Sequence, residues 1–309
     1  MGLVSGHTHD HIDWADRLAL LRAADALDAP AQAAIATRLV ADLPAGLPAN
    51  RSDGLPAGPT VVDFGCGAGG MSTHFARALA GQGGGTIVLV DATPELLQEA
   101  ERAVRAAAAE EAAAQVTVQA IVADLADPGL PGQLPAADVV WASRVVHHLP
   151  DQQAAVGTIA SIARGGGTVA LAEGGLSFSC LPWDLGVGRP GLEDRLQAAQ
   201  AEWFVGMRES IDRAVPMPYG WPIALERAGL VKVSSFSALV DHPAPGPDGL
   251  VDYVHHHLSR LSTHAAEQLS DEDQTVLASL LDTGSEHYLG KRRDLYLLGV
   301  RTVHHGRRP

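Results

Sequence analysis

The sequence predicts an α/β fold built on a doubly wound parallel sheet. Short apolar runs alternate with segments of helical spacing from residue 60 to residue 175. The runs are almost continuously apolar, which is typical of strands that are covered on both faces by crossover helices. A chain of 309 residues has room for this sheet and for further segments around it.

The first half of the chain supplies most of this alternation. Between residues 13 and 42, leucine and isoleucine recur at near-helical spacing, and the sequence LDAP at 27–30 interrupts them, so two helices are expected there. A linker rich in proline and glycine follows. Strands are then expected at 60–65, 85–92 and 116–125, and helices at 70–81 and 93–115. Thr93 and Pro94 are typical start signals for the second of these helices.

In the second half, the rhythm changes after Glu173. Strands at 137–144 and 166–175 flank a helix that follows LPDQ, and an aromatic, proline-punctuated segment comes next. A helix at 220–230 and a strand at 231–239 resume the sheet, and a helical insertion at 248–284 precedes a final strand at 294–305. Within this insertion, Ser270 and Asp273 have the spacing of a capping box.

Composition excludes several classes of partner. The formal net charge of −14 disfavours binding to nucleic acid or to an anionic membrane surface. The chain has no apolar run of about 18 residues, and its start lacks the basic and apolar regions of a signal peptide. Its two cysteines, Cys66 and Cys180, are too few for a disulfide framework. We therefore expect a cytoplasmic protein that acts on a small molecule.

A glycine-rich loop follows the first strand in the sequence VVDFGCGAGG at 61–70. Glycines at this position allow a tight turn and let main-chain N–H groups approach a ligand at a helix N-terminus. Gly65, Gly67 and Gly70 also fit the G-x-G-x-x-G spacing of dinucleotide-binding proteins, so the glycines alone do not identify the ligand. Asp63 is more informative, because its carboxylate would repel a pyrophosphate and would suit a cationic ligand.

These residues resemble the first motif of class I S-adenosylmethionine-dependent methyltransferases, in which an apolar run precedes an acid and then G-x-G-x-G. Asp63, Gly65, Gly67 and Gly69 carry the resemblance, which extends from Thr60 to Glu173 and returns at the last two strands. It implies a Rossmann-like sheet of seven strands with the last strand reversed, together with a helical cap and lid insertions. It also implies S-adenosylmethionine as cofactor and S-adenosylhomocysteine as product.

The resemblance implies roles for further residues at the strand ends. Asp91, with Ala92 after it, closes the second strand where the family's acid accepts both ribose hydroxyls. Asp124 matches the acid that contacts the adenine amino group, with the amide of Leu125 beside it. Ser143 follows the fourth strand, where the family lines the methionine end of the cofactor. Cys66 lies within the cofactor loop and is interpreted as a small residue that contacts the ligand through its main chain.

Proton transfer during methylation is assigned to the histidines of the sequence VVHHLPD. His148 is the first candidate for a general base and His147 is the second, because both follow the fourth strand at the edge where ligands bind. Packing or helix capping is the alternative for either residue. A metal site is not expected. The histidines at 7, 9 and 11 and at 255–257 offer no tetrahedral set with suitably placed carboxylates. No acids occur in the sequence SRVVHHL after the fourth strand, where the magnesium-dependent catechol-type methyltransferases have theirs.

Aromatic residues gather where a lid is expected. In related small-molecule enzymes, an N-terminal helical cap and a late insertion cover the acceptor pocket, and this chain has apolar side chains there: Trp14, Phe178, Trp183, Trp203, Phe204, Met207, Met217, Tyr219 and Trp221. They either line a pocket or pack the lid on the core. Arginines in the same region could bind an acidic acceptor or could form salt bridges within the protein. They are Arg144, Arg189, Arg195 and Arg208.

The sequence thus predicts four parts. They are a helical cap and linker at 1–59, a cofactor-binding core at 60–175, a lid insertion at 176–220, and the completion of the sheet at 221–309 with its helical insertion at 248–284. The predicted reaction is methylation of an oxygen or nitrogen of a small-molecule or short-peptide acceptor in specialised-metabolite biosynthesis, by a monomer or homodimer. Two alternatives stay open: a nicotinamide-dependent oxidoreductase, and a protein that binds the cofactor without transferring a methyl group.

Overall fold

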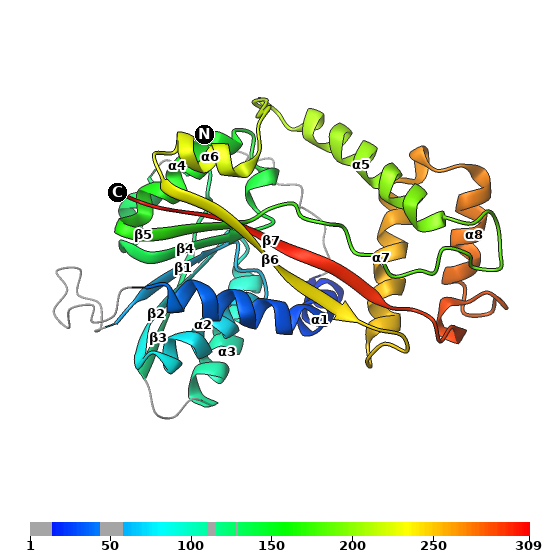
Figure 1. Cartoon of the computed structure of the whole chain (residues 1–309), viewed down its shortest axis with the longest axis horizontal. Coiled ribbons are helices and arrows are strands. Elements are labelled where there is room, and N and C mark those ends of the chain that lie inside the picture. Colours follow the sequence, from blue (N-terminus) through cyan, green and yellow to red (C-terminus); the bar gives the residue numbers. More distant parts are fainter. Residues whose placement is uncertain (1–13, 44–57, 111–114, 128) are drawn as a thin grey trace.

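The computed structural model describes residues 14–43, 58–110, 115–127 and 129–309. Its centre is a seven-stranded sheet with the order β3-β2-β1-β4-β5-β7-β6 (Figure 1). The strands are β1 Thr60–Phe64, β2 Gly84–Asp91, β3 Gln115–Val122, β4 Ala137–Ser143, β5 Ala163–Ala172, β6 Val231–His242 and β7 Leu297–Arg307. Strands β1 to β5 pair in parallel, and β7 runs antiparallel to both β5 and β6. The predicted doubly wound sheet with a reversed last strand is confirmed.

Helices cover both faces of this sheet. On one face, α2 (Gly70–Gly81) and α3 (Pro94–Glu110) pack over apolar side chains such as Val61 and Ile87. On the other face, α4 (Gln152–Ile162) and α6 (Trp221–Arg227) pack over the alternate residues of the same strands, such as Val62 and Val88. Successive side chains of a strand point to opposite faces, so strands covered on both sides become apolar throughout, as the sequence predicts.

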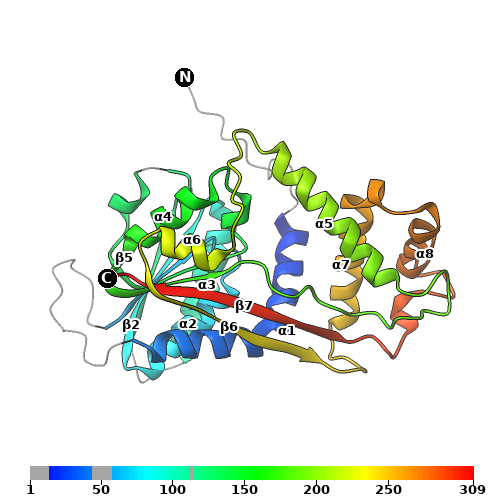
Figure 2. The same cartoon turned by 45° about the horizontal axis from the view of Figure 1, so that its top comes forward.

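The N-terminal segment corrects one expectation. The sequence predicts two helices interrupted at LDAP, but residues Trp14–Ala41 form one helix, α1, with Pro30 inside it. The helix changes direction along its length, as Figure 2 shows. Proline has no N–H for the helical hydrogen bond and its ring presses on the preceding turn, so a bend is the expected result. Beyond Pro30, Ile35 and Leu39 are buried against α2 and the sheet, and this packing favours continued helix.

A second apolar core lies at the far ends of β6 and β7. It joins α5 (Leu192–Ser210), α7 (Leu250–His264) and α8 (Asp271–Leu281) with the segment around Leu181. In both views these helices stand beyond the seven-stranded region, and the long strands β6 and β7 lead to them (Figures 1 and 2). The two segments that interrupt the sheet in the sequence therefore pack together as one helical module.

The short 3-10 helices and the connections complete the element list. They are η1 Leu130–Gln133, η2 Val146–His148, η3 Ala266–Gln268 and η4 Leu289–Lys291. In the part of the chain that the structure covers, no helix combines the length and apolarity needed to cross a membrane.

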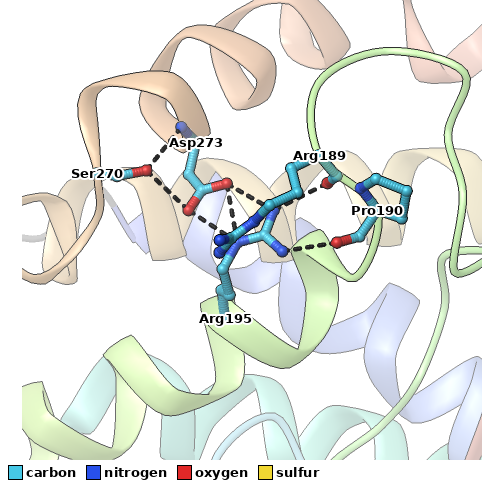
Figure 3. Close-up of polar contacts among 5 residues, drawn as sticks. All are labelled: Arg189, Pro190, Arg195, Ser270 and Asp273. Atoms are coloured by element: carbon cyan, nitrogen blue, oxygen red, sulfur yellow. Dashed lines mark hydrogen bonds and ion pairs between the residues drawn. The ribbon is translucent and has the colours of Figure 1, made fainter.

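An arginine joins α5 to α8 inside the helical module (Figure 3). Arg195 donates to both carboxylate oxygens of Asp273 at 2.7–3.0 Å and to the carbonyls of Arg189 and Pro190 at 3.0 and 2.8 Å. The Ser270 hydroxyl accepts from the Asp273 amide at 3.1 Å, which confirms the predicted helix cap. The hydrogen bonds from Arg195 hold the pKa of Asp273 below its usual range. Arg195 is therefore a structural residue and not an acceptor-binding one.

Candidate functional site

The glycine loop forms the turn between β1 and α2. The N–H groups of Gly65 and Cys66 donate to the carbonyl of Val90 at 2.8 and 3.2 Å, which ties the loop to the end of β2. Gly65 has a φ of 62°, and a Cβ at this position would overlap the side chain of Val145. Glycine is therefore required at position 65 by both backbone conformation and space.

Two carboxylates lie directly beside this loop. Asp63, at the end of β1, is 2% exposed and accepts a hydrogen bond from the Ser72 hydroxyl. Burial, together with the nearby charges of Asp91 and Asp25, raises the pKa of Asp63 to about 7, although the bond from Ser72 acts in the opposite direction. A carboxyl group in this state gains from a cation placed next to it, because the positive charge stabilises its ionised form.

Asp91, at the end of β2, joins two loops. Its Oδ2 accepts from the Gly67 amide at 3.0 Å and its Oδ1 accepts from the Thr93 amide at 2.9 Å. Each carboxylate oxygen has two lone pairs, so these bonds still leave acceptor capacity for a ligand hydroxyl. Ala92 lies between Asp91 and Thr93 in the sequence and is exposed.

Asp124 and Ser143 occupy the corresponding ends of β3 and β4. Asp124 is half-buried and its Oδ1 accepts from the Ala126 amide at 2.9 Å, while the neighbouring Leu125 is buried. Ser143 is the last residue of β4 and is half-buried. The sheet order therefore brings the predicted residues of four adjacent strands to one edge, where doubly wound sheets bind ligands.

Cys66 and Gly69 have mainly local roles in the loop. The Cys66 amide donates to the Val90 carbonyl, and the Gly69 amide donates to the Cys66 carbonyl at 2.9 Å. The Cys66 thiol is buried, which raises its pKa well above the usual range. A thiol held in this neutral form is a poor nucleophile.

A third carboxylate reaches the loop from α1, and sequence analysis missed it. Asp25 lies over Gly70, where any Cβ would overlap its carboxyl group. Gln32 donates to Asp25 at 3.0 Å, and burial raises the pKa of Asp25. The contact joins residues far apart in the sequence, so no local pattern could have shown it.

A histidine–carboxylate pair lies beyond β4. The Nδ1 atom of His147 is 2.6 Å from Oε2 of Glu173, which is 1% exposed at the end of β5. The other oxygen of Glu173 accepts from the amides of Val145 and Val146, both at 2.8 Å. With the Nδ1 hydrogen directed to the carboxylate, Nε2 is left as a proton acceptor. Glu173 was not among the predicted site residues, and only its place after a strand end could have suggested it.

His148 differs from His147 in its environment. His148 is exposed, and its ring centroid is 4.1 Å from that of His147. Environment thus distinguishes the two candidates, because the buried carboxylate of Glu173 contacts the second candidate base, His147. Arg208 of α5 donates to the carbonyls of His147 and Leu149, both at 2.8 Å, so the helical module is fastened to this loop.

The aromatic residues of the expected lid do not gather in one place. Phe204 is 37% exposed and its ring centroid is 5.7 Å from that of His147. Trp203 stacks on His264 within the module, whereas Trp183 is 71% exposed. Tyr219 packs on the opposite core, where Arg227 lies over its ring. Phe204 is therefore the aromatic residue of this group with a contact to the histidine pair, and the Trp14 side chain lies outside the described part.

The sequence has two further groups of histidines, at 7, 9 and 11 and at 255–257. Those at 7, 9 and 11 lie outside the described residues. The histidines at 255–257 lie on α7, where His255 contacts the Leu281 carbonyl at 3.2 Å and burial lowers the pKa of His257 to about 4. Across the described ranges, no three His, Cys, Asp or Glu side chains are grouped so as to hold a metal ion.

Comparison with known proteins gives one family match. Residues 62–169 match the family model of a methyltransferase domain. A search of curated protein sequences gave no match. Among solved structures, an O-methyltransferase family protein from Burkholderia thailandensis is 18% identical, with 69% of this chain and 53% of that chain covered at a TM-score of 0.44.

Two further solved structures carry a bound cofactor product. A methyltransferase from Thiobacillus denitrificans with S-adenosylhomocysteine is 18% identical, with 81% of this chain and 86% of that chain covered at a TM-score of 0.38. Phosphoethanolamine N-methyltransferase 2 from Haemonchus contortus is 14% identical, with 82% of this chain and 50% of that chain covered, also at a TM-score of 0.38.

Proposed function

We propose that this chain, whose residues 62–169 match the family model of a methyltransferase domain, transfers a methyl group from S-adenosylmethionine to an oxygen or nitrogen atom of a small molecule or short peptide. S-adenosylhomocysteine is the second product. The observation that carries the proposal is the placement of Asp63, Asp91 and Asp124 at the ends of three adjacent strands beside the glycine loop. Specialised-metabolite biosynthesis in the cytoplasm is the proposed setting, and the two buried free cysteines fit a reducing compartment.

The charges around the loop support a cationic cofactor over a redox dinucleotide. Asp25 and Asp91 both lie close enough to Asp63 for their negative charges to raise its pKa. A pyrophosphate at this loop would add negative charge to this group, whereas a sulfonium nucleoside with an ammonium group would compensate it. When bound, S-adenosylmethionine supplies an electrophilic methyl group on a positively charged sulfur.

We assign the cofactor-binding residues by their positions at the sheet edge. Asp91 would accept hydrogen bonds from the ribose hydroxyls, and Asp124 with the Leu125 amide would bind the adenine. The glycine loop and Ser143 would enclose the methionine part. The hydrogen bonds to Asp91 from Gly67 and Thr93 support this assignment, because they fix the carboxylate before a ligand arrives.

His147 is the residue we propose as general base. Its Nε2 would accept the proton of the acceptor hydroxyl or amine as the methyl group is transferred. Glu173 would act as a positioning residue, since its bond to Nδ1 orients the ring and stabilises the imidazolium that forms. The two backbone amides on Glu173 in turn fix the carboxylate. His148 is exposed, and it becomes the second candidate.

The helical module would cover the acceptor. Phe204 of α5 lies next to His147, and Arg208 of the same helix binds the loop that carries it. We propose that the segments 176–220 and 248–284 together form the lid, with Phe204 excluding water and supporting an apolar part of the acceptor. Alignment of the acceptor and exclusion of water are the main requirements of a direct displacement.

Ligand binding tests the cofactor assignment. We expect S-adenosylhomocysteine to raise the melting temperature and to give binding heat in calorimetry, and NAD to do neither. Asp91→Asn should weaken S-adenosylhomocysteine at least tenfold. Asp241→Asn is a matched control, since this residue lies on β6, which is at the far edge of the sheet. Tight binding of NAD with no binding of S-adenosylhomocysteine would overturn the proposal.

Product formation separates an enzyme from a protein that only binds the cofactor. Release of S-adenosylhomocysteine would be followed with a panel of hydroxyl and amine acceptors. For an acceptor that reacts, His147→Gln should lower kcat about a hundredfold, whereas His148→Gln should keep the rate and its pH profile. The reverse order of effects would transfer the base role to His148.

A further inference from the structure

Arg144 lies in the loop that follows β4, and its charge is not used in any hydrogen bond or ion pair within the described part of the chain. It follows Ser143 at the end of β4, three positions before His147. The residue is exposed. Its φ of 56° lies in the left-handed region, which a residue other than glycine adopts only when its surroundings require it.

Other arginines near the site already have partners. Arg208 donates to the carbonyls of His147 and Leu149. Arg301 of β7 donates to the buried carboxylate of Asp28 at 3.0 and 2.5 Å and lies over the ring of Phe178. The chain has 36 acidic and 22 basic residues, so acidic partners are abundant. The absence of a carboxylate bound to Arg144 within the described ranges therefore follows from its position and not from a shortage of acids.

The charged groups around Arg144 come from three elements. Arg301 on β7 faces it, with Asp28 and Asp25 on α1 and Tyr253 on α7. Asp28 is already bound to Arg301. Asp25 accepts from Gln32 at 3.0 Å, and burial raises its pKa.

The electrostatic state of Arg144 agrees with this geometry. Burial, and then the charge of Arg301, lower the pKa of its guanidinium, although solvent still reaches the side chain. The guanidinium is therefore open to a ligand from the solvent, and Arg301, Asp28 and Asp25 are its charged neighbours.

We propose that Arg144 binds a carboxylate group within the active site. A guanidinium matches the two oxygens of a carboxylate with parallel hydrogen bonds, and this pairing is strong where water is partly excluded. The inference rests on the proposed function, which supplies two sources of a carboxylate: the amino-acid end of the cofactor and an acidic acceptor. Both would lie between the end of β4 and the helical module.

Calorimetry with three ligands distinguishes these sources. S-adenosylhomocysteine has the amino-acid end, and 5′-methylthioadenosine lacks it. Benzoate, titrated into the ligand-free and the S-adenosylhomocysteine-loaded protein, represents an acidic acceptor. Each is measured with the unchanged protein, Arg144→Gln and Arg144→Lys. The matched control is Arg213→Gln, because Arg213 has a similar φ of 58° and a side chain that is 90% exposed.

If the carboxylate belongs to the cofactor, Arg144→Gln will weaken S-adenosylhomocysteine tenfold or more without changing 5′-methylthioadenosine. If it belongs to the acceptor, both nucleosides will bind as before and benzoate binding will be lost. In either case Arg144→Lys should recover part of the affinity, and Arg213→Gln should have no effect.

Unchanged affinity of Arg144→Gln for both nucleosides, with no loss of benzoate binding, would overturn the inference. Equal weakening of the two nucleosides would do the same, because it would show that Arg144 only supports the shape of the site. If the unchanged protein bound neither nucleoside, the proposed function would fail, and the benzoate titration of the ligand-free protein would still test Arg144 separately.

Discussion

Replacing Asp63 by asparagine should make the ligand-free protein more stable at neutral pH. Asp63 is buried, and its pKa in the folded protein is raised to about 7. An aspartate in an unfolded chain has a pKa of about 3.9. The pKa of Asp63 is therefore about three units higher in the folded protein than in the unfolded chain, and each unit corresponds to about 1.4 kcal/mol.

The sign of the effect follows from the direction of the shift. Because the folded pKa is the higher one, the contribution of Asp63 to stability is fully present below pH 4 and is lost as the pH rises to about 7. Between pH 5 and pH 8 the loss is about 2.5 kcal/mol. Asparagine has no proton to lose, so the stability of Asp63→Asn relative to the unchanged protein should rise by this amount over the same interval.

Urea denaturation at several pH values measures this difference. The unfolding free energies of the two proteins are compared at each pH, so that the titration of all other groups cancels. Asp138→Asn is a useful control, since Asp138 is equally buried at 2% exposure but is paired with Arg164 at 3.1 Å. Parallel stability curves for the unchanged protein and Asp63→Asn would refute the reasoning, because they would show that Asp63 is ionised throughout.

Cofactor binding should offset the loss of stability that ionised Asp63 causes. A cation beside Asp63 lowers its pKa, so binding of S-adenosylmethionine at pH 7 should release about half a proton. Calorimetry in two buffers of different ionisation enthalpy would detect the release, and Asp63→Asn should abolish it. Asp63→Asn should also bind the cofactor at least tenfold more weakly.

Three further substitutions test the site and the helical module. Gly65→Ala should lower the free energy of unfolding by about 1–3 kcal/mol and abolish S-adenosylhomocysteine binding; stability and affinity at the level of the unchanged protein would contradict the strain at this turn. Asp273→Asn should lower the free energy of unfolding by about 2 kcal/mol at pH 7, because its bonds to Arg195 are weakened. This difference from the unchanged protein should shrink as the pH falls through the depressed pKa of Asp273 in the folded protein. Urea denaturation at pH 7 and pH 3 measures it, and a difference that persists in acid would contradict the role of the ion pair. Glu173→Gln should lower kcat about tenfold or more while leaving cofactor affinity unchanged, and an unaltered kcat would remove Glu173 from the orientation of His147.

The sheet and the glycine loop could be predicted from the sequence because their signals are local. Apolar runs, helix starts and glycines fix where strands and turns occur, and the order of the strands then brings their ends to one edge. The contacts of Asp25 with Gly70 and of Glu173 with His147 could not be predicted in this way. Each depends on how two distant elements pack, and a pattern shows where an element ends without showing which side chain lies opposite.

Helix α1 illustrates the same limit. The proline in LDAP correctly indicates a disturbance at that point, and local propensity favours ending the helix there. Burial of Ile35 and Leu39 against α2 and the sheet adds stabilisation that no local pattern contains. The result is one bent helix, whose first half brings Asp25 to the cofactor loop and Asp28 to Arg301.

The helical module and the sheet have separate apolar cores. Trp141 is buried in the core of the sheet, whereas Trp203 lies on α5 of the helical module. Local opening of α5, α7 and α8 would therefore leave the cofactor half intact, and unfolding need not follow a single cooperative step. Hydrogen exchange should then show two protection classes. Evolution could also replace the helical module, which we propose covers the acceptor, while the sheet stays as it is.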